Sequence, residues 1–293
     1  MQGRSGPLII GILATLVAAF STAAADTILF VGNSFTYGAY SPVEHYRPGI
    51  VTDLNGTDVG GVPALFKAFT DEAGLHFDVS LETKGGVNFD FHLLERQPLI
   101  DRAWDHVVLQ GYSTLDATTP GDATRFIDDS GKLAALFVSK NPAVDVRLTA
   151  TWSRADLTYL PTGHWFGQPI GAMEHDIRVA CDKALAASGH IRAVMPVGEA
   201  WNRAIDKRVA TPNPYEGTHK GAIDLWAPDN YHASTYGYYL EALVIFGSVT
   251  GRDPRGLGAQ ESAARDLAIP EALAVELQRI AAETLDSEPR KGR

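Results

Sequence analysis

Short apolar runs alternate with longer amphipathic stretches along this chain, and this alternation limits its fold more than any other feature. Five runs have the length and composition of buried strands, at residues 27–31, 77–81, 106–109, 144–150 and 191–195. A helical pattern follows each of them, at residues 62–73, 89–101, 123–139, 170–187 and 199–208. Strands joined by helices run parallel, because each helical crossover returns the chain to the end of the sheet at which the previous strand began. The pattern therefore predicts a five-stranded parallel sheet with helices on both faces and a ligand crevice at the carboxyl ends of its strands.

The first 25 residues have the organisation of a secretory signal peptide. Arg4 supplies a short basic region, residues 7–20 are uncharged and mostly apolar, and three alanines precede Asp26 at the expected cleavage point. A membrane anchor is the alternative, but 14 apolar residues are fewer than the ~20 that span a bilayer. We therefore expect a secreted or periplasmic protein in which residues 26–293 form a single domain.

Charge and cysteine content exclude two classes of protein. The chain has 35 acidic and 25 basic side chains, a formal net charge of −10, so it lacks the surplus of Lys and Arg that neutralises nucleic-acid phosphates. Its one cysteine, Cys181, has no partner for an intrachain disulfide. We expect a globular protein stabilised by its core, with no nucleic-acid partner and no membrane span in residues 26–293.

The first strand runs into Gly32-Asn33-Ser34-Phe35-Thr36, which places a serine at a strand-to-helix turn. Glycine permits a tight backbone there, and the beginning of a helix supplies free backbone N–H groups. Such a position suits a nucleophile, although a serine there can also simply cap the helix. The pentapeptide is not the Gly-x-Ser-x-Gly elbow of lipase-like folds, which requires glycine at the position of Thr36.

A second motif, Asp229-Asn230-Tyr231-His232, lies in a loop before a helical pattern at residues 233–249. Its spacing lets the Asp229 carboxylate accept the Nδ1 proton of His232 and leaves Nε2 directed at a nucleophile. In the alternative interpretation, Asp229 caps the helix and His232 is an ordinary helix-start residue.

Together the two motifs resemble the SGNH (GDSL-type) hydrolase superfamily, in their order and in their separation of about 195 residues. The resemblance implies a three-layer α/β/α flavodoxin-like fold and cleavage of esters, commonly acetyl groups on sugars or acyl chains on lipids. It assigns Ser34 as nucleophile, His232 as general base and Asp229 as the acid that orients His232.

The resemblance also implies an oxyanion hole made by the Ser34 amide, a glycine amide and an asparagine side chain. Gly86, in the turn that follows the second strand, is the best match to the glycine, and a plain turn is its alternative role. After the third strand the family has Gly-x-Asn-Asp, but this chain has Gln110 followed by Gly111, Tyr112 and Ser113. The chain thus resembles a divergent branch without that asparagine, in which Gln110, or alternatively Ser113, takes its place.

Such a site needs no metal and no organic cofactor, and the remaining histidines show no metal-ligand spacing. We expect the substrate to be a small-molecule or glycan ester, most simply an O-acetylated carbohydrate. Six aromatic residues near the carboxyl-end loops are candidate sugar platforms or, alternatively, core residues: Trp152, Trp165, Trp226, Tyr159, Tyr215 and Tyr231. The alternative functions are a catalytically silent carbohydrate-binding relative and a lipid esterase. The sequence leaves open the acyl group, a lid and the oligomeric state.

Overall fold

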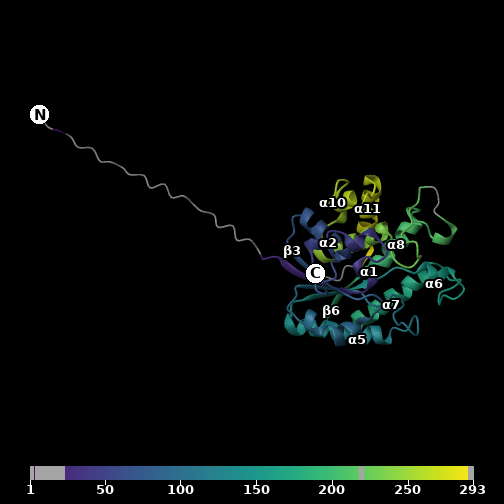
Figure 1. The fold of residues 1–293 in the computed structure, drawn as a ribbon, viewed down its shortest axis with the longest axis horizontal. Helices are drawn as coiled ribbons and strands as arrows, with labels where there is room; N and C mark the ends of the chain where they lie inside the picture. The colour runs from purple at the N-terminus through teal and green to yellow at the C-terminus, as the bar shows by residue number, and fades with distance from the viewer. Residues whose placement is uncertain (1–2, 4–23, 218–220, 290–293) are drawn as a thin grey trace.

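The computed structural model describes residue 3 and residues 24–217 and 221–289. Most of the predicted signal peptide therefore lies outside the described residues. The described chain forms three layers, with helices on both sides of one sheet (Figure 1). Among the described residues, no helix is both long and apolar enough to cross a membrane.

The sheet has six strands, all parallel, in the order β2-β3-β1-β4-β5-β6. The strands are β1 (Asp26–Gly32), β2 (Thr52–Asp53), β3 (Phe77–Thr83), β4 (His106–Leu109), β5 (Asp145–Ala150) and β6 (Ile191–Pro196). Five of them are the predicted ones, and the α/β fold class is confirmed. The sixth, β2, is a two-residue edge strand within residues 40–60, where the sequence shows only a long connection.

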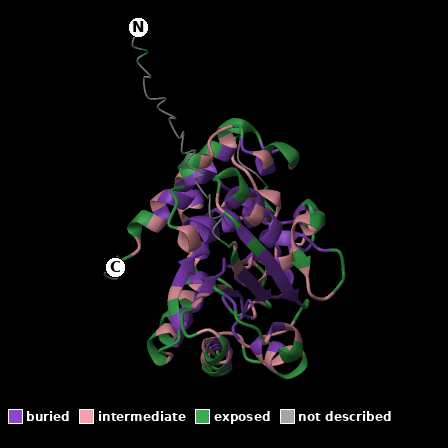
Figure 2. Cartoon of the chain, turned by 90° about the vertical axis from the view of Figure 1, so that its left-hand side faces the viewer, coloured by how far each residue is buried: buried purple, intermediate pink, exposed green. Residues whose placement is uncertain are grey.

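Two hydrophobic cores lie on the two faces of the sheet. Alternate residues of a strand point to opposite faces, so Ile28 and Phe30 of β1 enter one core while Leu29 and Val31 enter the other. The first core also contains residues of α2 (Gly61–Glu72), α8 (Val197–Asp206), α9 (Thr235–Thr250), α10 (Ser262–Asp266) and α11 (Glu271–Ser287). The second contains residues of α3 (Phe89–Glu95), α4 (Gln97–Ile100), α5 (Thr124–Lys140) and α7 (Gly171–Ala187). Figure 2 shows the buried strands between the two helical layers.

One predicted helix, at residues 89–101, is divided in the structure. Helix α3 ends at Glu95, and α4 begins at Gln97 with proline in its first turn. Pro98 has no N–H for a continuous helix and restricts the residue before it, so the break follows from local chemistry.

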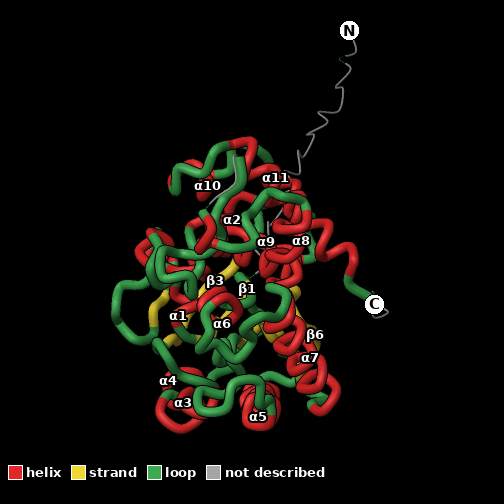
Figure 3. The backbone as a smooth tube through the Cα atoms, turned by 90° about the vertical axis from the view of Figure 1, so that its right-hand side faces the viewer, coloured by secondary structure: helices red, strands yellow, loops and turns green. Residues whose placement is uncertain are grey.

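The strand order determines where a ligand can bind. From β1, one neighbour is β3 and the other is β4, so the helices that follow β1 and β4 diverge to opposite faces. This divergence leaves a crevice beyond the carboxyl ends of β1 and β4, the usual ligand site of flavodoxin-like sheets. Two short helices, α1 (Ser34–Tyr37) and α6 (Ala155–Tyr159), lie in front of the sheet when this side faces the viewer (Figure 3).

Candidate active site

Ser34 lies at the carboxyl end of β1, as the first residue of α1. Asn33 caps this helix, because its Oδ1 accepts the Phe35 N–H at 3.2 Å. The Ser34 hydroxyl therefore does not cap the helix, and its hydrogen-bond partner is the His232 ring. Ser34 is buried, with 6% of its surface exposed, and the crevice shields it from bulk water.

Asn33 also joins the loops around Ser34. Its backbone N–H donates to Gln110 Oε1 at 3.0 Å, and its Nδ2 donates to the carbonyls of Val87 at 3.2 Å and Gly111 at 3.1 Å. These bonds connect the segments that leave β1, β3 and β4. The sequence pattern predicts no role for Asn33, and the only signal for one is its position beside Ser34.

Gly32 permits the sharp turn before Ser34. A Cβ atom at this position would lie 2.1 Å from Thr36 Oγ1 and 2.9 Å from Gln110 Oε1. Both contacts are shorter than real Cβ atoms make, so glycine is required for close packing.

His232 and Asp229 lie in the loop before α9 and reach Ser34 from the opposite end of the chain. His232 Nε2 is 2.9 Å from Ser34 Oγ, and His232 Nδ1 is 2.6 Å from Asp229 Oδ2. The other carboxylate oxygen, Oδ1, accepts the N–H groups of Tyr231 at 3.1 Å and His232 at 3.0 Å. Asp229 thus fixes both the ring and the backbone of the histidine.

The hydrogen bonds of Asp229 keep it ionised. Burial raises the pKa of its carboxyl group, but the bonds from the His232 ring and from the Tyr231 and His232 amides outweigh burial and place the pKa below its ordinary value. An ionised Asp229 accepts a hydrogen bond from the Nδ1–H group, so His232 holds its hydrogen on Nδ1 and presents a free lone pair at Nε2. The arrangement can therefore accept the proton of the Ser34 hydroxyl.

Gly86 lies in the turn after β3, close to this group. Its φ of +73° is in the left-handed region, which favours glycine. The turn is tied to the segment that carries Ser34, because the Lys84 N–H donates to the Gly32 carbonyl at 3.1 Å and Asn33 Nδ2 donates to the Val87 carbonyl. Within the described residues, the N–H groups of Ser34 and Gly86 donate no hydrogen bond, so both are free to bind an oxygen.

Two solved structures share this architecture. A DUF4886 family protein from Bacteroides uniformis has a TM-score of 0.63 and 19% identity, over 90% of this chain and 96% of its own. A protein assigned to the GDSL-like lipases, from Parabacteroides merdae, has a TM-score of 0.53 and 17% identity, over 77% of this chain and 95% of its own. No family model and no curated protein sequence matches the chain.

This chain shares the three-layer α/β/α fold of these two structures. Within this fold, the serine and histidine motifs of the sequence meet beyond the carboxyl end of β1. The glycine motif follows β3, the strand beside β1, and is hydrogen-bonded to the serine segment.

Gln110 follows β4, where the resemblance to SGNH hydrolases implies an asparagine a few residues further on. Gln110, the residue after β4, is buried, and its Oε1 accepts from the Asn33 N–H and from Thr36 Oγ1 at 3.1 Å. Its Nε2 donates to the Gly111 carbonyl. Gln110 thus supports the turn that carries Ser34, and one of its two amide hydrogens has no partner among the described residues. Ser113, the alternative, is also buried and accepts from Arg154 at 3.4 Å.

Three of the candidate sugar platforms are core residues. Trp152, Trp165 and Trp226 are all buried. The Trp152 ring stacks on Phe35 at 4.1 Å and on Trp201 at 4.6 Å, beneath the nucleophile helix. These tryptophans could be sugar platforms or core residues, and the structure shows that they are core residues. Their side chains turn inward from the loops that carry them.

Two tyrosines flank the imidazole of His232 instead. The Tyr231 ring lies 4.0 Å from it at 33°, and the Tyr40 ring lies 4.6 Å from it at 23°. Tyr231 is one of the predicted candidate platforms, whereas Tyr40 was not predicted from the sequence. The available signal for Tyr40 was its position six residues after Ser34, in the long connection of residues 40–60.

The other histidines within residues 24–217 and 221–289 form no comparable group. His92 is buried and pairs with Glu82 through Nδ1, on the face of the sheet that α3 covers. Across the described residues, no cluster of three His, Cys, Asp or Glu side chains is arranged to hold a metal ion.

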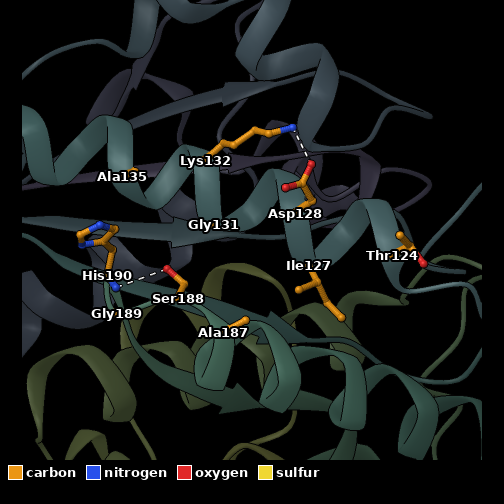
Figure 4. Close-up of a pocket in the computed structure, with 10 residues that line it drawn as sticks. All are labelled: Thr124, Ile127, Asp128, Gly131, Lys132, Ala135, Ala187, Ser188, Gly189 and His190. Atoms are coloured by element: carbon orange, nitrogen blue, oxygen red, sulfur yellow. Dashed lines mark hydrogen bonds and ion pairs between the residues drawn. The ribbon is translucent and has the colours of Figure 1, made fainter.

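Two hollows on the surface differ in their relation to this site. A groove of about 500 Å³ lies between α5 and the turn before β6, and its lining, which includes Asp128, Lys132 and His190, contains none of the predicted site residues (Figure 4). A hollow of about 300 Å³ has Gly86 in its wall, together with Asn88, Tyr112 and Arg125. The second hollow adjoins the candidate oxyanion site and offers space for a bound substrate.

Proposed function

We propose that this protein is a secreted SGNH-type serine esterase that hydrolyses carboxylic esters through Ser34, His232 and Asp229. The continuous hydrogen-bonded series from Ser34 Oγ to His232 Nε2, and from His232 Nδ1 to Asp229, carries this proposal. A binding module has no use for a serine, an imidazole and a carboxylate aligned in this order.

The reaction has two stages. In the first, the Ser34 hydroxyl gives its proton to His232 Nε2 while Oγ attacks the ester carbonyl carbon and forms a tetrahedral intermediate. The bond from carbon to the alcohol oxygen then breaks, and Nε2 returns the proton to that oxygen. In the second stage, water gives a proton to Nε2 and attacks the acyl-enzyme, which releases the acid and restores Ser34.

The negative oxygen of the intermediate needs donors that are oriented before the reaction begins. The N–H groups of Ser34 and Gly86 fill this role because they have no other acceptor among the described residues. We assign the third donation to the free amide hydrogen of Gln110, in place of the asparagine that the family uses. Asp229 stays ionised and stabilises the imidazolium that forms in each stage.

We further propose that the substrate carries short acyl groups, such as O-acetyl, on a carbohydrate, and that residues 1–25 direct export. Cleavage before Asp26 would leave β1 complete, since this strand begins at that residue. Residues 26–293 would then act as one catalytic domain.

Covalent labelling tests the catalytic assignment without knowledge of the substrate. A fluorophosphonate probe reacts with a serine only when a neighbouring base activates it, and mass spectrometry then identifies the modified residue. We expect modification of Ser34 in the purified protein and no modification in His232→Ala. His190→Ala removes an exposed histidine outside the site and serves as the matched control, with labelling expected at the rate of the unmodified protein.

A folded protein that remains unlabelled would contradict the esterase and favour the catalytically silent carbohydrate-binding relative. Thermal denaturation of each variant establishes folding. Labelling of a different serine would contradict the assignment of Ser34.

A further inference from the structure

Tyr40 is an exposed aromatic residue in contact with the candidate general base. It exposes 69% of its surface, the largest fraction among the exposed aromatic side chains of the described residues. One face of its ring stacks on the His232 imidazole, with ring centroids 4.6 Å apart. Because the residue is so exposed, the opposite face of the ring remains open to a ligand.

The backbone of Tyr40 is held in an unusual conformation. Its φ of +63° lies in the left-handed region, which a bulky residue rarely adopts. The residues on both sides are anchored to α9, since the Ala39 carbonyl accepts from the buried Tyr238 hydroxyl at 3.1 Å and Ser41 Oγ lies 3.4 Å from Thr235 Oγ1. Strain of this kind is retained where surrounding structure imposes it, commonly at functional sites.

The chemistry of ester cleavage determines which part of the substrate lies beside Tyr40. His232 Nε2 must return its proton to the alcohol oxygen, so that oxygen binds within hydrogen-bond distance of the imidazole. The alcohol portion of the ester therefore extends next to the ring stacked on this imidazole. The acyl portion is attached to Ser34 and is directed toward the oxyanion donors.

We propose that Tyr40 determines specificity for the alcohol portion of the substrate, and that its open face binds a pyranose ring. This inference rests on the proposed esterase function and deepens it. A pyranose presents a flat array of C–H groups that covers an aromatic face, whereas an acyclic alcohol has no such surface. The three buried tryptophans cannot provide this platform, because other side chains cover their rings.

The test compares two acetate esters that differ only in the alcohol. Acetate release is measured for methyl acetate and for an O-acetylated methyl pyranoside, and the ratio of their kcat/KM values is calculated. We expect Tyr40→Ala to lower the ratio of pyranoside to methyl acetate about threefold to tenfold, mainly through KM of the pyranoside. Tyr40→Phe retains the ring and should retain the ratio. Phe166→Ala removes another exposed aromatic ring, one with no ring contact to His232 and not among the candidate sugar platforms, and is the matched control.

An equal loss with both esters would overturn the proposal, because Tyr40 would then act by positioning His232. An unchanged ratio, or turnover of methyl acetate without turnover of the pyranoside, would overturn it as well.

A binding measurement separates this inference from the esterase proposal. Saturation-transfer NMR of Ser34→Ala with methyl pyranoside requires no catalysis, and we expect a signal that Tyr40→Ala removes in the same background. No sugar signal in a protein whose Ser34 is labelled by fluorophosphonate would refute the role of Tyr40 and leave the esterase intact. A sugar signal in a protein that is not labelled would contradict the esterase proposal and leave sugar binding at Tyr40 intact.

Discussion

Replacing Asp229 by asparagine changes which ring nitrogen of His232 carries the hydrogen, while the loop that holds His232 keeps its shape. The Asp229 carboxylate accepts three hydrogen bonds, two at Oδ1 from backbone N–H groups and one at Oδ2 from His232 Nδ1. In Asp229→Asn, the amide oxygen keeps the two backbone bonds, so the loop retains its shape. The amide NH₂, however, faces Nδ1 at the 2.6 Å contact, and two N–H groups cannot point at each other.

His232 must then become an acceptor at Nδ1 and carry its hydrogen at Nε2. That hydrogen points at Ser34 Oγ, 2.9 Å away, where the proposed reaction needs a lone pair. A general base contributes about 10²–10⁴-fold, and the same Asp-to-Asn change in the Ser-His-Asp triad of serine proteases reduces kcat by about 10⁴-fold. We expect kcat to fall by about 10³–10⁴-fold, equivalent to about 4–5.5 kcal/mol of activation free energy, with little change in KM.

Initial rates of acetate release, measured across ester concentrations at neutral pH, give both constants. Thermal denaturation should show a melting temperature close to that of the unmodified protein. Asp253→Asn is the matched control, because Asp253 also accepts a backbone N–H, that of Arg255 at 2.9 Å, beyond the far end of α9. Activity of Asp229→Asn within tenfold of the unmodified protein would refute the reasoning, since Asp229 would then have no part in the tautomer of His232.

Two further predictions concern stability. Gln110→Ala removes the acceptor of the buried Asn33 N–H, and an unpaired buried donor costs about 1–3 kcal/mol, so the urea midpoint of unfolding should fall; an unchanged midpoint would show that the turn does not need this side chain. Glu241 is fully buried in α9, and desolvation raises the pKa of its carboxyl group well above the ordinary 4.5. The folded protein therefore keeps the carboxyl proton of Glu241, while the unfolded chain loses this proton as pH rises. The free energy of unfolding should therefore decrease with rising pH above about 4.5, by at most about 1.4 kcal/mol per pH unit from this group. Glu241→Gln has no proton to lose, so its melting temperature relative to the unmodified protein should rise between pH 5 and pH 8, and a constant difference would contradict a neutral Glu241.

The fold was predictable because buried strands and amphipathic helices have different patterns of apolar residues along the sequence. A strand covered on both faces reads as a continuous apolar run, as residues 28–31 do, and the observed β1 extends the predicted strand by one residue at each end. The exceptions have local or tertiary causes. Pro98 divides a predicted helix, whereas β2 exists because Thr52 and Asp53 pair with an edge that only the folded sheet provides.

The candidate site was predictable where two residues share a motif. Asp229 and His232 are three positions apart, and a single loop is enough to bring them into contact. Ser34 lies far from both in sequence, so its contact with His232 depends on the order of the strands and on the path of α9. The hydrogen bonds of Gln110 and Asn33 have the same origin, because each crosses from one strand end to another.

The sequence by itself determined the class of fold and the identity of the three aligned residues, since periodicity and short motifs are local properties of a chain. The tertiary structure decided which aromatic rings face the crevice. Trp152 lies inside a stack of rings, whereas Tyr40 lies open above His232, and nothing in the local sequence around either residue distinguishes them. The physical reason is that burial depends on the neighbours that folding supplies, and the neighbours of both residues come from distant segments of the chain.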